Sequence, residues 1–349
     1  MANTFYTIEA PGIRCTLCDL GASIAGVAVR DRRGALIEVA LPCDSFYSER
    51  PGRYSAGRTI GPCCGRVKDG EAFIDRRRCA LTQNEGRNHL HGGVNGCAGQ
   101  RWTVQAHDSA SVRFALTLPD GLDGYPGNRV LSAEYRVDEN ALYVVYSATT
   151  DAATWLDMTN HVYWDLGGRF DGSAMDQSLE LASSKVVFND ASHLPTAIVD
   201  VDSAFDFASP CTLSEKLREH SAHPQLINAR GFNNAYVLDP AAVRSRGFSA
   251  RLYSPVSGIR MTMATDQPAI VLYSGGYLND QTRLRLAPGA ASPGCAIALE
   301  AQGLPDPFHL PGAVAGILNR GEQYRREICW RFDVPPFHTS NASEAVIQY

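Results

Sequence analysis

The chain has 349 residues, of which 44% are hydrophobic and 20% are charged, and its formal net charge is −5. This hydrophobic fraction can form a large core, and charge is too sparse for a disordered chain. The slightly acidic balance argues against a nucleic-acid-binding protein, which would carry a basic surface. The sequence contains no run of 18 apolar residues, the length needed to span a membrane. Residues 1–10 lack the features of a signal peptide. We expect a cytoplasmic globular protein, monomeric or homodimeric, that binds neither nucleic acid nor membrane.

Short runs rich in Val, Ile, Tyr, Phe and Thr, separated by 31 glycines and 19 prolines, indicate β-strands along the chain. In chain order these runs are 13–20, 25–30, 112–118, 129–137, 141–149, 155–164, 250–254, 259–264, 269–273, 296–301 and 326–334. Residues 138–140 have the turn character expected between two strands of a hairpin. One short helix is expected at 214–220, with Thr212 or Ser214 as its N-cap.

These elements indicate an all-β protein with very little helix. Long amphipathic helical patterns are nearly absent, which argues against βαβ units and favours a large antiparallel β-sandwich. We expect a single domain over residues 1–334. Residues 335–349 begin with two prolines and then turn polar, so we expect a tail outside this domain.

The ten cysteines are expected to be reduced thiols that serve as small apolar residues. Cys15 and Cys18 form a C-x-x-C, but no second ligand pair follows at zinc-site spacing. His89 and His91 would face the same side of a strand, but the sequence offers no convincing third ligand. We therefore expect no metal site.

The run 155–164 carries a polar and aromatic face. Alternation in a strand places on that face Trp155, Asp157, Thr159, His161 and Tyr163. This composition is typical of a surface that faces a ligand rather than a core. His161 is therefore a candidate for acid–base chemistry, with a structural, hydrogen-bonded histidine as the alternative.

A carboxylate, Glu300, interrupts an expected strand of small and apolar residues. Alternation places Glu300 on one face with Ala296, Ala298 and Gln302, where the alanines leave room for a ligand. A buried carboxylate is costly unless it is paired or used, so a structural salt bridge is the alternative. Together with His161, Glu300 could form a general acid–base pair, although spacing alone does not bring the two together.

Two further positions are candidates for binding polar ligands. His91 precedes Gly92 and Gly93, which would let the backbone approach a ligand closely, and its imidazole can donate to a hydroxyl. Arg66 follows Gly65 and can bind several oxygens through its guanidinium. The alternatives are a structural histidine and a surface ion pair.

Four motifs together resemble the aldose 1-epimerase (galactose mutarotase) family, in that family's order. TNHVYWDLGG at 159–168 resembles T-N-H-x-Y-F-N-L-x-G, and NHLHGG at 88–93 resembles N-x-L-H-G-G. DGLDGYPGN at 120–128 is similar to D-G-x-x-G-Y-P-G-N, and LEAQGLPD at 299–306 is similar to L-E-T-Q-x-x-P-D. The resemblance extends over nearly the whole chain, to about residue 334.

This resemblance implies an antiparallel β-sandwich with an open carbohydrate cleft and no metal or other cofactor. It implies that a small sugar is the substrate, that His161 is the general acid and Glu300 the general base, and that His91 and Arg66 contact the sugar. The implied reaction interconverts α and β anomers by opening and reclosing the sugar ring. Near neutral pH we expect an ionised Glu300 and a protonated His161 at the start of this reaction.

Three family positions differ in this chain. Gly65 stands where the family has an Asn, and Val271 where it has a substrate-binding Gln. Asn233 stands where the family has an Asp that binds a sugar hydroxyl, and the resemblance makes it a third candidate for substrate binding. Because an amide is not an anionic acceptor and valine forms no hydrogen bond, we expect weak binding of galactose and glucose. Two alternatives stay open: the same acid–base pair acting on a less hydroxylated cyclic hemiacetal, and a non-catalytic carbohydrate-binding protein.

Overall fold

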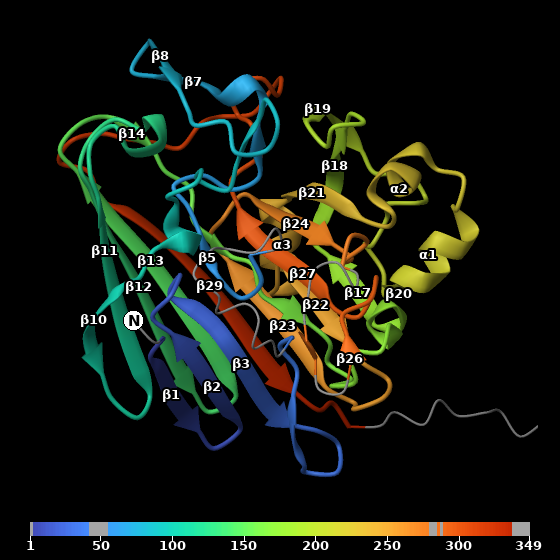
Figure 1. Cartoon of the computed structure of the whole chain (residues 1–349). Coiled ribbons are helices and arrows are strands. Elements are labelled where there is room, and N and C mark those ends of the chain that lie inside the picture. The colour runs from blue at the N-terminus through green and yellow to red at the C-terminus, as the bar shows by residue number, and fades with distance from the viewer. Residues whose placement is uncertain (1–2, 42–54, 279–284, 287–288, 337–349) are drawn as a thin grey trace, which may run out of the picture.

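The structure is a computed structural model that describes residues 3–41, 55–278, 285–286 and 289–336. It consists mainly of β-strands, all paired in antiparallel fashion in this part of the chain, as predicted (Figure 1). The predicted tail 335–349 lies almost entirely outside the described residues.

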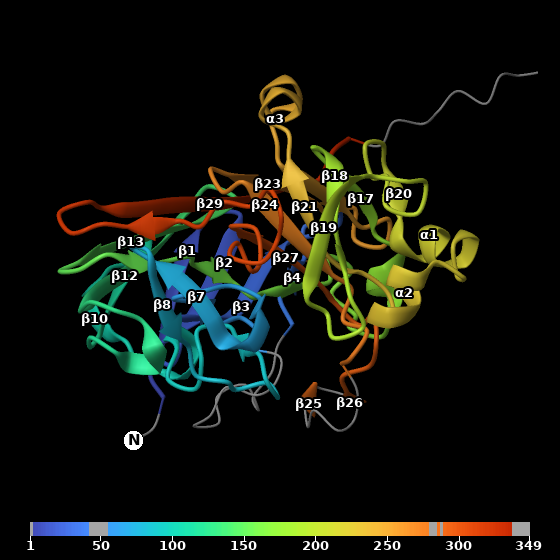
Figure 2. The same cartoon turned by 90° about the horizontal axis from the view of Figure 1, so that it is seen from above.

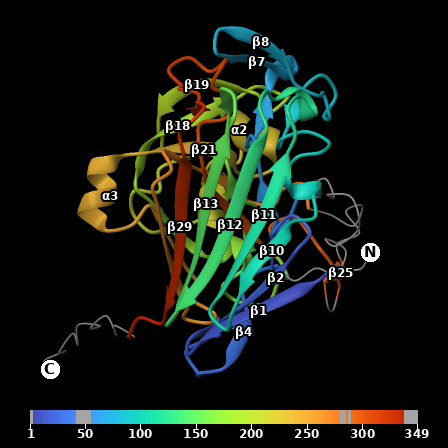
Figure 3. The same cartoon turned by 90° about the vertical axis from the view of Figure 1, so that its left-hand side faces the viewer.

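The largest sheet has nine strands, and Figure 3 shows its long strands β10 to β13 and β29 side by side. In order across the sheet they are β10 (Thr103–His107), β11 (Ser111–Leu118), β12 (Arg129–Asp138), β13 (Ala141–Thr150), β29 (Tyr324–Asp333), β23 (Arg260–Thr265), β22 (Ala250–Tyr253), β17 (Ser178–Leu181) and β20 (Cys211–Thr212). The hairpin predicted around 138–140 is confirmed, since Asp138 of β12 pairs with Ala141 of β13.

A six-stranded sheet carries the pocket described below. In order across the sheet its strands are β16 (Tyr163–Trp164), β27 (Ile297–Gln302), β24 (Ala269–Tyr273), β21 (Asn233–Leu238), β18 (Ser183–Asn189) and β19 (Pro195–Asp200). A third sheet contains β1 (Phe5–Ala10), β2 (Ile13–Cys18), β3 (Ser23–Arg30) and β4 (Leu36–Glu38).

The remaining strands form two-stranded pairs. These are β14 (Thr154–Trp155) with β28 (Ile317–Leu318), β15 (Thr159–Asn160) with β5 (Thr59–Ile60), β6 (Arg66–Val67) with β9 (His89–Leu90), β7 (Glu71–Ile74) with β8 (Arg77–Ala80), and β25 (Arg285–Leu286) with β26 (Gly289–Ala290).

The α-helices of the described residues are short. They are α1 (Leu213–Glu219), α2 (Pro224–Ala229) and α3 (Pro240–Arg246). The first confirms the predicted helix, and Thr212 caps it through a capping box with Glu215. In Figure 2, α1 and α2 lie together beside β20, and α3 stands apart. None of these helices is long and apolar enough to cross a membrane.

One hydrophobic core cluster is formed by residues of the nine-stranded, six-stranded and four-stranded sheets. Ile297 and Leu299 of β27 belong to it, and Trp164 of β16 meets Trp330 of β29 with ring centroids 5.8 Å apart. Full burial of a side chain such as Ile297 or Leu299 contributes about 1.5–3 kcal/mol to stability. The cluster runs from Ile8 to Phe332, which supports a single domain over 1–334; that boundary stays a prediction.

Candidate active site

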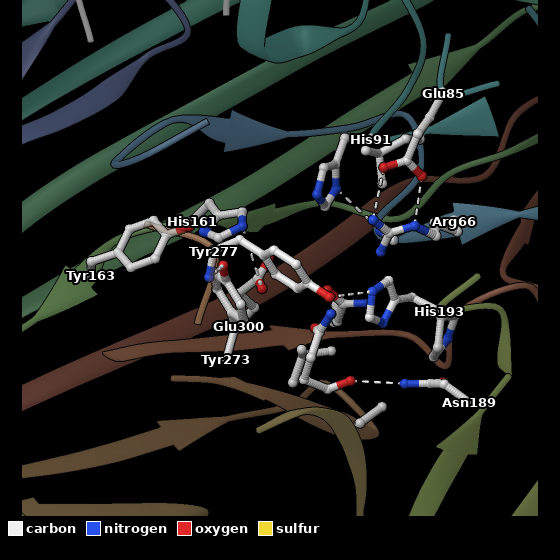
Figure 4. Close-up of a pocket in the computed structure, with 17 residues that line it drawn as sticks. Arg66, Glu85, His91, His161, Tyr163, Asn189, His193, Tyr273, Tyr277 and Glu300 are labelled. Atoms are coloured by element: carbon white, nitrogen blue, oxygen red, sulfur yellow. Dashed lines mark hydrogen bonds and ion pairs between the residues drawn. The ribbon is translucent and has the colours of Figure 1, made fainter. Parts of the chain in front are cut away.

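A pocket of about 200 Å³ opens on the face of the six-stranded sheet that points away from the main core. Its volume suits one small molecule. All five candidate site residues line it, from segments far apart in the chain: Arg66, His91, His161, Asn233 and Glu300. Figure 4 labels Arg66, His91, His161 and Glu300 among the lining side chains.

His161 and Glu300 lie next to each other in this pocket. The Nε2 atom of His161 lies 3.6 Å from Oε1 of Glu300, and their side chains are only 7% and 4% exposed. This separation is too long for a good hydrogen bond. Within the described residues, Nδ1 of His161 and Oε2 of Glu300 also have no hydrogen-bond partner. Buried polar atoms are normally satisfied, so this pair has hydrogen-bonding capacity left for a ligand.

The alternation predicted around Glu300 is confirmed. Ile297 and Leu299 of β27 point into the main core, whereas Ala298 belongs to a second cluster on the pocket side. Strand β27 lies between β16 and β24, and Glu300 is directly opposite Val271 of β24. A strand buried on both faces thus holds the carboxylate in one position.

The prediction of a single strand over 155–164 is wrong. This run divides into β14, β15 and β16, which pair with β28, β5 and β27 respectively. Three different partners require the backbone to change direction between the pieces. The five residues predicted to share a face are therefore all buried, but only His161 and Tyr163 of that face line the pocket.

Backbone and ring contacts fix the position of His161. Its N–H donates to the carbonyl of Arg58 at 2.9 Å, and its carbonyl accepts from the N–H of Gly57 at 2.8 Å. Its ring stacks on Tyr163, with centroids 4.9 Å apart and planes 22° apart. Tyr273 approaches the same ring edge-on at 6.4 Å.

Burial sets the protonation of this pair of side chains. Loss of hydration lowers the pKa of His161 to about 4. Burial first, and the nearby charge of Asp157 second, raise the pKa of Glu300 to about 8. At neutral pH the pocket therefore holds a neutral His161 and a protonated Glu300, which is the reverse of the expected starting state. The pair carries one proton in total between about pH 4 and pH 8.

Arg66 and His91 form the adjoining wall of the pocket. The Nε and Nη2 atoms of Arg66 donate to the two carboxylate oxygens of Glu85 at 2.6 and 2.8 Å. The Nδ1 atom of His91 accepts from the N–H of Gly65 at 3.2 Å, which leaves the ring proton on Nε2. Burial, with the charges of His161 and Arg66, lowers the pKa of His91 well below its usual range, so this ring is neutral.

Comparison with known proteins shows the family of the chain. The family model described as aldose 1-epimerase matches residues 4–329. The chain belongs to the aldose 1-epimerase family. The galactose mutarotase of Bos taurus is 28% identical over 332 residues, which cover 94% of each chain. The aldose 1-epimerase of Escherichia coli (strain K12) is 28% identical over 298 residues, which cover 84% of each chain.

Solved structures of the aldose 1-epimerase family confirm the predicted fold. The GalM/aldose epimerase homologue from C. elegans aligns with a TM-score of 0.85 at 27% identity, covering 95% of this chain and 99% of that one. The galactose 1-epimerase from Lactobacillus acidophilus NCFM aligns with a TM-score of 0.79 at 28% identity, covering 94% and 93%.

The two glycines after His91 have a different role from the one expected. Neither lines the pocket. A Cβ atom added to Gly92 would lie 2.0 Å from the carbonyl oxygen of Gly61, and one added to Gly93 would lie 2.6 Å from Cγ of Asp123. These glycines therefore allow close packing of the loop against its neighbours rather than the approach of a ligand.

His89 is a structural residue. Its Nδ1 atom is 2.6 Å from the carbonyl oxygen of Thr82, and its Nε2 atom is 2.7 Å from the hydroxyl of Tyr125. Within the described part of the chain, no three His, Cys, Asp or Glu residues are grouped so that they could hold a metal ion. The cysteines described are free thiols, most of them buried.

Several pocket residues were not predicted. They come from loops, strand ends and turns: Glu85, Asn189, His193, Tyr273 and Tyr277. The His193 ring and the Tyr277 hydroxyl are 3.0 Å apart, and Asn189 donates to the carbonyl of Asn233 at 2.8 Å. These contacts connect separate segments, and no periodic pattern in the sequence indicates them.

Proposed function

We propose that this protein is a mutarotase that interconverts the α and β anomers of an aldose, with His161 and Glu300 as its catalytic pair. The observation that carries this proposal is the 3.6 Å separation of the two side chains in a pocket of monosaccharide scale. The ring oxygen and the C1 hydroxyl oxygen of an aldose are bonded to the same carbon. An acid and a base that act on them must therefore lie side by side, as these groups do.

The reaction proceeds by two coupled proton transfers. Glu300 takes the proton of the C1 hydroxyl, the C1–O1 bond becomes a carbonyl, the bond from C1 to the ring oxygen breaks, and His161 protonates that oxygen. Rotation about the C1–C2 bond then presents the other carbonyl face. The ring oxygen attacks this face while His161 recovers its proton and Glu300 returns a proton to O1. Atoms and charge balance without a cofactor.

The protonation state that burial favours belongs to the same cycle. A protonated Glu300 with a neutral His161 is the state that follows ring opening. Ring opening starts with this single proton on His161 and with Glu300 ionised. A C1 hydroxyl that donates to Glu300, and a ring oxygen that accepts from His161, both favour the charged forms and draw the proton to His161.

Arg66, His91 and Asn233 are the proposed substrate-binding residues. They line the pocket around the acid–base pair, and each presents polar atoms that can bind a sugar hydroxyl. The position of Arg66 is supported by its two bonds to Glu85, which orient the guanidinium at the pocket wall.

Polarimetry or NMR of pure anomers tests this function. The protein is expected to accelerate the approach of at least one aldose to anomeric equilibrium, across a panel of hexoses, pentoses and deoxy sugars. Saturable sugar binding without acceleration would instead identify a carbohydrate-binding protein and refute the catalytic proposal.

A further inference from the structure

Side chains of the six-stranded sheet form one side of the pocket, which we call its floor. Along one line that crosses neighbouring strands, these side chains change from polar to apolar. Tyr163 of β16 pairs with Ala298 of β27, and His161, two residues before Tyr163, lies beside Glu300 with Nε2 3.6 Å from Oε1. On the other side of Glu300, Val271 of β24 is directly opposite it. The line therefore runs from His161 through Glu300 to Val271.

The line continues into an apolar surface. Ala235 of β21 is directly opposite Val271. Side chains directly opposite each other on one face have Cβ atoms about 4.5–5.5 Å apart, so each step is comparable with the width of part of a sugar ring. Val271 also packs on a cluster that contains Ala235, Val187 and Leu310. Neither Val271 nor Ala235 has a side-chain atom that forms a hydrogen bond.

The order of these side chains can be matched to the order of atoms in an aldose. This step rests on the proposed function, in which His161 faces the ring oxygen and Glu300 faces the hydroxyl on C1. In the ring, C1 lies between the ring oxygen and C2. The side chain on the far side of Glu300 from His161 therefore faces the substituent on C2, and that side chain is Val271.

We propose that the preferred substrates of this enzyme are aldoses that lack a hydroxyl at C2, that is, 2-deoxyaldoses. A C2 hydroxyl placed against Val271 would lose its hydrogen bonds to water and gain none from the floor. A methylene group at C2 would instead contribute favourable burial of apolar surface. Gln302 is the next polar side chain on this face of β27. Its amide N–H already donates to the carbonyl of Gly303 at 3.2 Å.

The first test compares matched pairs of sugars. The kcat/KM for anomerisation, divided by the uncatalysed rate constant of each sugar, is measured for 2-deoxyglucose against glucose and for 2-deoxygalactose against galactose. We expect a preference of about ten- to a hundredfold for the 2-deoxy member, the scale on which apolar sites reject an added hydroxyl. Equal or higher values for the 2-hydroxylated sugars would overturn the inference.

A positional control uses 6-deoxygalactose, which lacks a hydroxyl far from C1. Its advantage over galactose is expected to be smaller than that of 2-deoxygalactose. A larger advantage for the 6-deoxy sugar would place the apolar floor elsewhere on the ring and would overturn the assignment to C2. Failure of the underlying function gives a different result, because no sugar would then be accelerated.

The second test changes the floor itself. Val271→Thr keeps the shape of the side chain and adds one hydroxyl, so it should shift the ratio of kcat/KM about tenfold toward the 2-hydroxylated sugars. Val130→Thr, the same change on β12 at a position that is 51% exposed, is the matched control and should leave the ratio unchanged. A folded Val271→Thr protein with the wild-type ratio would overturn the inference.

Discussion

Both carboxylate oxygens of Asp157 lie 3.0 Å from the backbone nitrogen of Gly303, whose N–H they accept. Asp157 precedes His161 by four residues, and Gly303 follows Glu300 by three. The bond therefore joins the segment that carries the proposed acid to the strand that carries the proposed base. The carboxylate is buried, at 6% exposed, and its charge helps to raise the pKa of Glu300.

Replacing Asp157 with Asn should move the high-pH limit of activity to lower pH. A negative charge near Glu300 opposes its ionisation, so removal of that charge lowers the pKa of Glu300 from about 8. The catalytic pair then loses its last proton at lower pH. The measurement is kcat/KM against pH, in which the basic limb should shift to lower pH while the acidic limb stays in place.

Asp165→Asn provides the control for this prediction. Asp165 is also buried and accepts backbone N–H bonds from Gly167, Arg169 and Phe170. Its loss should reduce stability without moving the basic limb. An Asp157→Asn profile that superimposes on the wild-type profile would show that Asp157 has only a structural role.

Glu300 should make the protein less stable at high pH. The unfolded chain loses this proton near pH 4.5, whereas the folded protein retains it up to about pH 8. The contribution of Glu300 to the free energy of unfolding is thus fully present below pH 4.5 and is lost as the pH rises through about 8, by about 1.4 kcal/mol for each pKa unit. Glu300→Gln removes this loss, so the excess of its melting temperature over the wild-type value should grow from about pH 4.5 to about pH 8 and then level off.

The matched control for stability is Glu9→Gln, at an exposed position on β1. Its melting temperature should follow the wild-type curve over the same pH range. If the Glu300→Gln curve also runs parallel to the wild-type curve, the carboxyl group is hydrated in the folded protein and the burial argument fails.

Arg66→Lys should weaken substrate binding more than it slows the chemical step. Lysine carries one compact charge and cannot make the two parallel bonds that Arg66 makes to Glu85. We expect KM to rise roughly tenfold with kcat changed much less, since a hydrogen bond to a charged group is worth about 1.5–3 kcal/mol. Arg113→Lys disrupts a similar pair with Glu134 outside the pocket and should leave KM unchanged. A fall in kcat alone for Arg66→Lys would contradict the binding role.

The sequence was sufficient to place Glu300. Ile297 and Leu299 of this strand point to the core, because large apolar residues pack there. Side chains alternate along a strand, so Glu300 lies on the opposite face. Alternation along a single strand over 155–164 also predicted the side of His161, but that single strand does not exist. The alternation holds over β16 and its extension to His161, but it does not hold across the breaks that separate β14, β15 and β16.

Two features of the site depend on three-dimensional packing and could not be predicted. Glu85, Asn189 and His193 reach the pocket through contacts between segments distant in sequence, and such contacts leave no local pattern. The protonation of His161 and Glu300 depends on how much water the surrounding strands exclude. For this reason the pKa values depart from the ordinary values assumed from the sequence, downward for His161 and upward for Glu300.

The measurement that tests the central claim most directly is the anomerisation rate of Glu300→Gln, His161→Asn and the double variant on the best substrate. Each single variant should lose about 10²–10⁴-fold in kcat with the fold intact, as judged by circular dichroism. The double variant should lose little more than either single variant, because ring opening needs both proton transfers. A folded Glu300→Gln protein that retains the wild-type rate would contradict the account.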